Sequence, residues 1–284
     1  MTHLYHYCSV AAFQAIASTQ RVRLSSVRHS NDATEGTLLF AAVARIAARA
    51  GVVDSDITIL QERAQLLETK FDGLALCMSE DGDLLSQWRG YADDGQGVAI
   101  GFSRAFLDEL IALFETTDDQ DDHFDIALYQ ARYSEGEHDA AIAPLFKLLQ
   151  DYQMGQPLPD APQTENVREL YRRIGALQSL RLSLEAYDHA YSLKHKAFAE
   201  EREWRLLRHF DWQRERPTGF HARRCRLVPY VDLEFSRVLS QAIGEVVLGP
   251  RHTTPTDVVE QFLQGTGHFG VSVTRSSSPY RRDA

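Results

Sequence analysis

The sequence has few cysteines, and no pattern connects them. The chain of 284 residues holds three, Cys8, Cys77 and Cys225, which are far apart and show no CxxC spacing. An odd number of widely separated cysteines argues against a disulfide framework and against a structural zinc site. We therefore expect free thiols in a reducing compartment.

Other absences exclude whole classes of enzyme and a membrane location. The sequence has no GxxxxGK[ST] loop, GxGxxG loop, HExxH or GxSxG. Nothing therefore supports a conventional NTPase, Rossmann oxidoreductase, zinc protease or α/β-hydrolase. The N-terminus has no cationic stretch before an apolar run, and apolar stretches end well before the roughly 18 residues that a membrane span needs. We expect a soluble, cytoplasmic protein with no membrane partner.

What is present is an ordinary globular composition with an uneven charge. Hydrophobic residues make up 44% of the chain and charged residues 25%, which is typical of a folded domain. The net charge of −10 argues against general affinity for a phosphate backbone. Residues 194–226 nevertheless carry ten basic and five acidic side chains. This segment is either a solvated basic face or a pocket for a phosphate-bearing ligand, and both interpretations stay open.

The predicted elements follow a mixed order and not a βαβα alternation. Alternating or apolar runs predict strands, whereas i, i+3 and i, i+4 apolar spacing predicts helices. This order favours an α+β fold with a mixed, mostly antiparallel sheet in one domain over residues 1–275, with helical insertions at about 32–69 and 137–190. The polar residues 276–284 are predicted to be a disordered tail. Strands are expected at about 4–8, 22–26, 74–79, 97–102, 126–133, 204–209, 225–229, 245–248 and 269–274.

The segment Phe198–Arg205 is the first candidate for a functional centre. On a strand, Glu201, Glu203 and Arg205 would share one face. Two carboxylates that close repel each other unless a cation lies between them, so such a pair is expensive to bury. The alternative is that the segment continues a helix, in which Glu201 and Arg205 form an ordinary i, i+4 pair. The pattern alone leaves both open.

Two further stretches combine polar and aromatic residues. The first predicted strand contains Tyr5-His6-Tyr7, and the region after the third contains Ser79, Ser86, Trp88 and Tyr91. Each stretch is either a core-packing unit or part of a ligand site. Trp88 and Tyr91 are three residues apart on a predicted helix, so their rings could form one aromatic wall.

The chain contains, in this order, the stretches Leu4–Ser9, Arg23–Ser26, Asn31-Asp32 with Glu35, Cys77–Glu80, Ser86–Trp88, Tyr91-Ala92, Gly97–Phe102, Lys196–Arg205 and Gly244–Pro250. Taken together, these stretches resemble the bacterial domain-of-unknown-function family 2971, and the resemblance covers roughly residues 4–250. Two departures from the family pattern are that Ala33-Thr34 follows Asn31-Asp32 where Pro-Phe is usual, and that Phe198 stands where the aromatic is often Trp.

A more distant resemblance, to the ADP-ribosyltransferase superfamily, implies a split sheet and a set of roles. His6 would grip the ribose of NAD, Ser79 or Ser86 would shape the nicotinamide pocket, and Glu203 would bind the ribose hydroxyl beside the reacting carbon. Glu201 would orient the acceptor. The resemblance further implies NAD contacts from Tyr5, Tyr7, Ser25, Trp88 and Tyr91, and pyrophosphate contacts from Arg23, Arg202 or Arg205.

The leading functional hypothesis is an NAD-consuming ADP-ribosyltransferase-like enzyme or NAD glycohydrolase. Cleavage of the nicotinamide–ribose bond develops positive charge on the ribose, which a fixed carboxylate stabilises. The family's bacterial setting suggests a role in defence or as a toxin, and the acceptor, a protein or a nucleic acid, stays open, as does the oligomeric state.

Two other hypotheses remain. One is a metal-dependent nuclease or hydrolase in which Asp32, Glu35, Glu201 and Glu203 hold Mg²⁺. The other is a non-catalytic module that binds a nucleotide or nucleic acid.

Overall fold

A computed structural model describes residues 2–29, 34, 37–52, 71–115, 126–153, 191–223 and 225–280. The parts of the predicted helical insertions at 53–70 and 154–190 lie outside these ranges, as do Asn31, Asp32 and Glu35. The strands are β1 (His3–Cys8), β2 (Arg21–Ser26), β3 (Phe71–Ser79), β4 (Val98–Ser103), β5 (Ile126–Gln130), β6 (Glu203–Asp211), β7 (Gly219–Arg223), β8 (Arg226–Glu234), β9 (Ile243–Leu248) and β10 (Ser272–Arg275). The helices are α1 (Val10–Thr19), η1 (Val27–His29), α2 (Leu38–Arg49), α4 (Leu85–Tyr91), α5 (Arg104–Glu115), α6 (Glu135–Gln153), η2 (Lys196–Glu201) and α8 (Thr256–Gly265).

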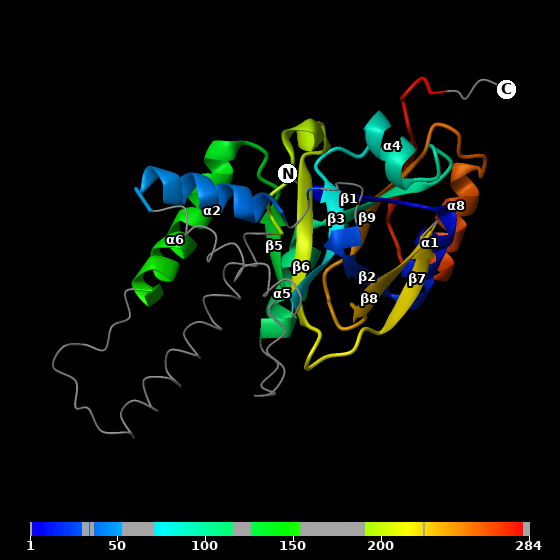
Figure 1. Cartoon of the computed structure of the whole chain (residues 1–284). Helices are drawn as coiled ribbons and strands as arrows, with labels where there is room; N and C mark the ends of the chain where they lie inside the picture. Colours follow the sequence, from blue (N-terminus) through cyan, green and yellow to red (C-terminus); the bar gives the residue numbers. More distant parts are fainter. Residues whose placement is uncertain are drawn as a thin grey trace.

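One mostly antiparallel sheet of ten strands forms the centre of the described part (Figure 1). Its main path runs β10-β9-β4-β1-β3-β2-β8-β7, while β6 pairs with β3 and β5 pairs with β6. The β10–β9 pair is parallel and the other pairs are antiparallel. The predicted α+β class with a mostly antiparallel sheet is confirmed.

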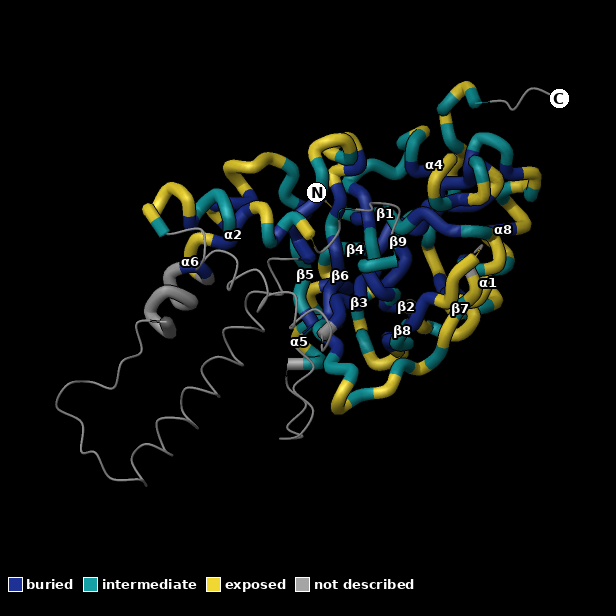
Figure 2. Tube along the Cα trace, viewed as in Figure 1, coloured by how far each residue is buried: buried dark blue, intermediate teal, exposed yellow. Residues whose placement is uncertain are grey.

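The main core lies between one face of this sheet and helices α1, α5 and α8. The strands contribute residues such as Ile100 and Leu206, and the helices contribute Phe13, Phe106 and Leu263, all buried in one cluster. Figure 2 shows this buried centre in dark blue. The first helix begins at Val10 because the Ser9 hydroxyl accepts a hydrogen bond from the Ala12 N–H at 3.1 Å and caps the helix.

Two strands leave the same edge of β3 in different directions. Along its other edge β3 pairs with β6 from end to end. On the edge of β3 opposite β6, β2 pairs only with Leu74 and Ala75, and β1 pairs only with Ser79. The edge between them, at residues 76–78, therefore has no strand partner among the described residues, and α1 connects the two diverging strands. This divergence is called the split below.

The segment around Glu201 differs from the predicted strand. The short helix η2 ends at Glu201, and Arg202 has a left-handed φ of 43° before β6 starts at Glu203. The interpretation that places Glu201 and Glu203 on one face of a strand is therefore wrong, because a turn separates them. The edge strand β7 is a further difference, since the sequence pattern does not predict a strand at 219–223.

Two helices and the end of the chain complete the described part. Apolar faces of α2 and α6 pack on each other beside the sheet, at the left of Figure 1. The first part of the predicted tail makes contacts as far as Tyr280: Ser277 donates to Asp83 at 2.8 Å, and Tyr280 donates to Asp94 at 2.6 Å. This part thus differs from the expected disorder. No helix among the described residues has an apolar stretch of membrane-spanning length.

Gly73→Ala should destabilise the fold by about 1–3 kcal/mol through overpacking. A Cβ on Gly73 of β3 would lie 2.6 Å from ring atoms of the buried Tyr191. The matched control is Gly136→Ala near the start of α6, where a Cβ would meet nothing within 4 Å and helix propensity favours alanine. Urea unfolding of both variants measures the difference. Equal stabilities would contradict the packing of Tyr191 on β3.

Candidate functional site

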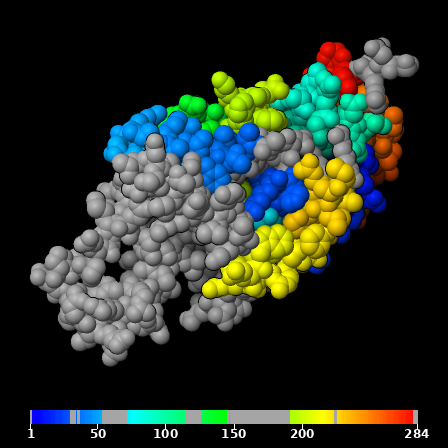
Figure 3. Space-filling view, viewed as in Figure 1, coloured from blue at the N-terminus to red at the C-terminus, as the bar shows by residue number. Residues whose placement is uncertain are grey.

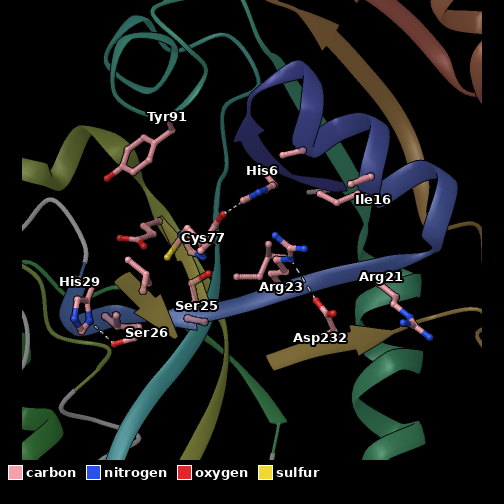
Figure 4. A pocket seen from close by; sticks show the side chains of 18 of the residues that line it. His6, Ile16, Arg21, Arg23, Ser25, Ser26, His29, Cys77, Tyr91 and Asp232 are labelled. Atoms are coloured by element: carbon pink, nitrogen blue, oxygen red, sulfur yellow. Dashed lines mark hydrogen bonds and ion pairs between the residues drawn. The ribbon is translucent and has the colours of Figure 1, made fainter. Parts of the chain in front are cut away.

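A cavity of about 450 Å³ lies at the split of the sheet. Its walls come from β1, α1, β2, η1, β3, the last residue of α4, Lys194, β6 and the β7–β8 hairpin (Figure 4). On the face seen in Figure 3, the blue N-terminal segment lies between lighter blue α2 and the yellow and orange hairpin. The cavity exists because β1 and β2 diverge there and α1 does not fill the gap.

Five of the site residues predicted from the sequence line this cavity. They come from three strands and a helix that are far apart in the chain: His6, Arg23, Ser25, Tyr91 and Glu203. Several other lining residues were not nominated, among them Ser26, His29, Cys77, Lys194 and Asp232. Lys194 belongs to the basic segment noted in the sequence, but nothing in the pattern distinguishes it from its basic neighbours.

The Lys194 ammonium lies between the two carboxylates of the candidate centre. Its Nζ is 2.5 Å from Oε2 of Glu201 and 2.5 Å from Oε2 of Glu203. Arg205 donates from Nε to Oε1 of Glu203 and from a terminal nitrogen to Oε2, both at 3.0 Å. It also donates to the Tyr191 carbonyl at 2.5 Å. We call these four charged residues, Lys194, Glu201, Glu203 and Arg205, the ion cluster.

The ion cluster is buried and formally neutral. Lys194 is 3% exposed, Glu203 5% and Arg205 1%, and two cations balance two anions. Burial opposes ionisation of Glu203, but Arg205 and Lys194 outweigh it and hold the pKa of Glu203 at about 2. Burial likewise opposes the charge on Lys194, yet Glu203 and Glu201 raise its pKa above the usual value. Both groups are therefore charged at neutral pH.

Glu201 has a different environment from Glu203. Burial raises the pKa of Glu201, and Lys194, with a smaller effect from Arg205, offsets this shift in part. Glu201 does not line the cavity, whereas Glu203 and Lys194 do. Of the two carboxylates, Glu203 is thus the one that a ligand in the cavity would meet.

His6 reaches into the split from β1. Its Nδ1 lies 2.8 Å from the Cys77 carbonyl oxygen, and a carbonyl only accepts, so Nδ1 carries the hydrogen. Burial lowers the pKa of His6, although the bond to the Cys77 carbonyl opposes this shift. The neutral ring then presents Nε2 as a hydrogen-bond acceptor, and His6 lines the cavity.

Several nominated residues make internal structural contacts instead. Ser79 donates to the Glu201 carbonyl at 2.7 Å and so joins β3 to η2. Tyr5 donates to Glu245 at 2.7 Å, and Tyr7 donates to the Asp81 carbonyl at 2.7 Å. None of the three lines the cavity described above.

The helix α4 also divides its nominated residues between core and cavity. Trp88 is fully buried, packs edge-on against Tyr7 with ring centroids 4.7 Å apart, and donates to Asp83 at 2.8 Å. Its ring is therefore not available for stacking on a ligand. Tyr91 lines the cavity, whereas Ser86 does not.

Several basic residues of the segment 194–226 form internal ion pairs. Arg208 bonds to Glu215, and Arg202 lies 2.8 Å from Asp81. Lys194 is the one described member of the ten that lines this cavity. The basic side chains at the cavity outside this segment are Arg21 and Arg23 of β2, which face Glu234 and Asp232 of β8 at 3.0 and 3.4 Å.

The carboxylates of the hydrolase hypothesis do not form a described metal site. Glu201 and Glu203 converge, but Lys194 occupies the space between them where a divalent ion would bind. Asp32 and Glu35 lie outside the described residues. Within the described ranges, no group of three or more His, Cys, Asp or Glu side chains has the arrangement of a metal site.

The comparison with family models covers the middle of the chain. Residues 87–206 match the family described as "Protein of unknown function (DUF2971)". The matched segment runs from α4 into β6 and includes Tyr91, Lys194, Glu201 and Glu203. It supports the resemblance to this family that the sequence indicates, and the family's description assigns no activity. No curated protein and no solved structure matches the chain.

Lys194→Met should lower the free energy of unfolding by about 3–5 kcal/mol, because it leaves two buried carboxylates with one cation. Adding Glu201→Gln should recover part of this loss by restoring neutrality. The control is Lys196→Met, two residues away and exposed, with an expected effect within about 0.5 kcal/mol. Urea unfolding measures all four proteins. A loss below about 1 kcal/mol for Lys194→Met would contradict the ion cluster.

Proposed function

We propose that the protein binds NAD in the cavity at the split and transfers its ADP-ribosyl group to an acceptor, with Glu203 as the catalytic carboxylate. The single observation that carries this proposal is that the cavity brings together His6, Arg23, Ser25, Tyr91 and Glu203. These residues lie up to about two hundred positions apart in the chain, and the sequence nominates each for the same ligand.

The size and polarity of the cavity suit the reacting half of NAD. A volume of about 450 Å³ lies within the range of roughly 300–1,000 Å³ that small-molecule sites have. Nicotinamide and its ribose would occupy the interior beside His6 and Glu203. The pyrophosphate would lie nearer the exposed Arg21 and Arg23, whose guanidinium groups suit phosphate oxygens.

The electrostatics of Glu203 support its role. A carboxylate with a pKa of about 2 is ionised at every physiological pH, and Arg205 fixes its orientation through two hydrogen bonds. Breaking the bond between C1′ and nicotinamide leaves positive charge on the ribose. A carboxylate already in place stabilises this charge without reorganising during the reaction.

The same contacts favour a second candidate, a module that binds a nucleotide without turnover. Both oxygens of Glu203 already accept hydrogen bonds from Arg205, and one also accepts from Lys194. These cations offset the carboxylate charge that catalysis would use. A purely structural ion cluster beside a binding cavity would have the same geometry.

Nicotinamide release and NAD binding separate these two functions. We expect the purified chain to bind NAD in calorimetry and to release nicotinamide, with a candidate acceptor or with water. Glu203→Gln should keep the dissociation constant within a few-fold and lower the release rate by at least about 100-fold. The control Glu260→Gln changes an exposed residue on α8 and should behave as the wild type.

Because Glu203→Gln disturbs a buried cluster, its urea midpoint is measured alongside, and Glu203→Asp, which keeps the charge, serves as a second variant. We expect Glu203→Asp to retain more activity than Glu203→Gln. NAD binding without release, unchanged by Glu203→Gln, would favour the binding module. The absence of both binding and release in the wild type would overturn the proposal.

A further inference from the structure

A second hydrogen-bonded chain reaches the cavity, and it is separate from the ion cluster. The Ser26 hydroxyl donates to Oδ2 of Asp72 at 2.8 Å, and the Ser26 oxygen lies 3.0 Å from Nδ1 of His29. The one hydroxyl hydrogen is used on Asp72, so Nδ1 of His29 must donate to the Ser26 oxygen. In the neutral ring, Nε2 is then left as an acceptor.

The chain runs from a buried carboxyl group to the cavity wall. Asp72 at the start of β3 is 2% exposed, and Ser26 at the end of β2 is 4% exposed. Their strands pair at this point, where Ser26 faces Leu74. Ser26 and His29 both line the cavity, and Figure 4 shows His29 bonded to Ser26 on a part of the wall away from His6. None of these residues contacts Glu203 in the contacts described above.

The charges around this chain favour a neutral imidazole beside an ionised carboxylate at pH 7. Burial, together with the cations Arg226 and Arg28, lowers the pKa of His29. Burial raises the pKa of Asp72 to about 6, although Arg28 and the Ser26 hydroxyl oppose this shift. Arg28 lies on η1, 3.6 Å from Oδ1 of Asp72, and also donates to the Tyr191 hydroxyl at 3.1 Å.

We propose that His29 is the general base that removes the proton from the acceptor hydroxyl, with Ser26 and Asp72 as positioning residues. Ser26 fixes the tautomer and orientation of the imidazole, and Asp72 stabilises the imidazolium that forms. A general base in an active site is commonly held in orientation by a further hydrogen-bonded group, and here Ser26 and Asp72 would orient His29. This inference rests on the proposed function, because it assigns the acceptor side of the same reaction.

The step balances without any further reactant. The acceptor oxygen, from water or another hydroxyl, bonds to C1′ of the ribose while its proton passes to Nε2 of His29. The bond between C1′ and the nicotinamide nitrogen breaks, and its electron pair stays on that nitrogen, which loses its positive charge. His29 then releases the proton to solvent.

The test compares nicotinamide release over pH 5–9 in the full chain and its variants. His29→Gln should keep NAD affinity within a few-fold, lower the rate by about 10²–10⁴-fold and remove the part of the profile that rises with pH. Ser26→Ala and Asp72→Asn should lower the rate less. They should also shift this rise to lower pH, because an imidazolium without its carboxylate partner loses its proton more readily.

The control is His3→Gln, at the start of β1 outside the cavity, which should follow the wild-type profile. A wild-type rate for His29→Gln, or an unshifted pH profile in both Ser26→Ala and Asp72→Asn, would overturn the role of His29. Urea midpoints of all variants show whether each is folded. His29 is half-buried, whereas Ser26 and Asp72 are buried, so substitution of His29 should be tolerated best.

A second measurement separates failure of this inference from failure of the proposed function. If the wild type releases no nicotinamide, the proposed reaction fails, and the His29 chain is tested by NMR titration of its ¹⁵N-labelled imidazole. We expect the His29 ring to carry its hydrogen on Nδ1 at pH 7, and we expect the pKa of His29 to be lower in Asp72→Asn than in the wild type. A hydrogen on Nε2, or an unchanged pKa of His29 in Asp72→Asn, would contradict the hydrogen-bonded chain from Asp72 through Ser26 to His29.

Discussion

The Lys194 ammonium, buried between Glu201 and Glu203, is the interaction on which the candidate site depends. It connects the segment after residue 190 to the end of η2 and the start of β6, while Arg205 ties Glu203 to the Tyr191 carbonyl. Buried charges are costly unless they are paired and hydrogen-bonded. The four charged groups of the ion cluster therefore hold one another in place, and they position Glu203 and Lys194 at the cavity wall.

Most of the strands could be predicted from the sequence because their patterns are local, whereas the edge strand β7 was not predicted. Apolar runs locate β3, β4 and β9, and the Ser9 cap locates α1. The turn at Arg202 could not be predicted, because a left-handed φ at an arginine leaves no signal in the pattern. One part of the ion cluster could be predicted, because two carboxylates as close as Glu201 and Glu203 require a cation between them. The identity of that cation, one of ten basic residues, could not be predicted because it depends on tertiary packing.

The same distinction applies to the nominated site residues. Those whose side chains face the split, such as His6 and Glu203, line the cavity, and those facing away, such as Ser79 and Trp88, serve internal contacts. Residue type alone does not separate the two groups, because a buried serine or tryptophan also needs a hydrogen-bond partner. His29 was missed because its partners Ser26 and Asp72 lie on two different strands, and only their pairing brings them together.

The central claim is that the cavity at the split is the ligand site. The most direct measurement is a crystal structure of the chain with a non-hydrolysable NAD analogue. We expect the nicotinamide-side ribose within hydrogen-bond distance of Glu203 or His6, and the pyrophosphate near Arg23. An analogue bound elsewhere, with the cavity at the split empty, would contradict it.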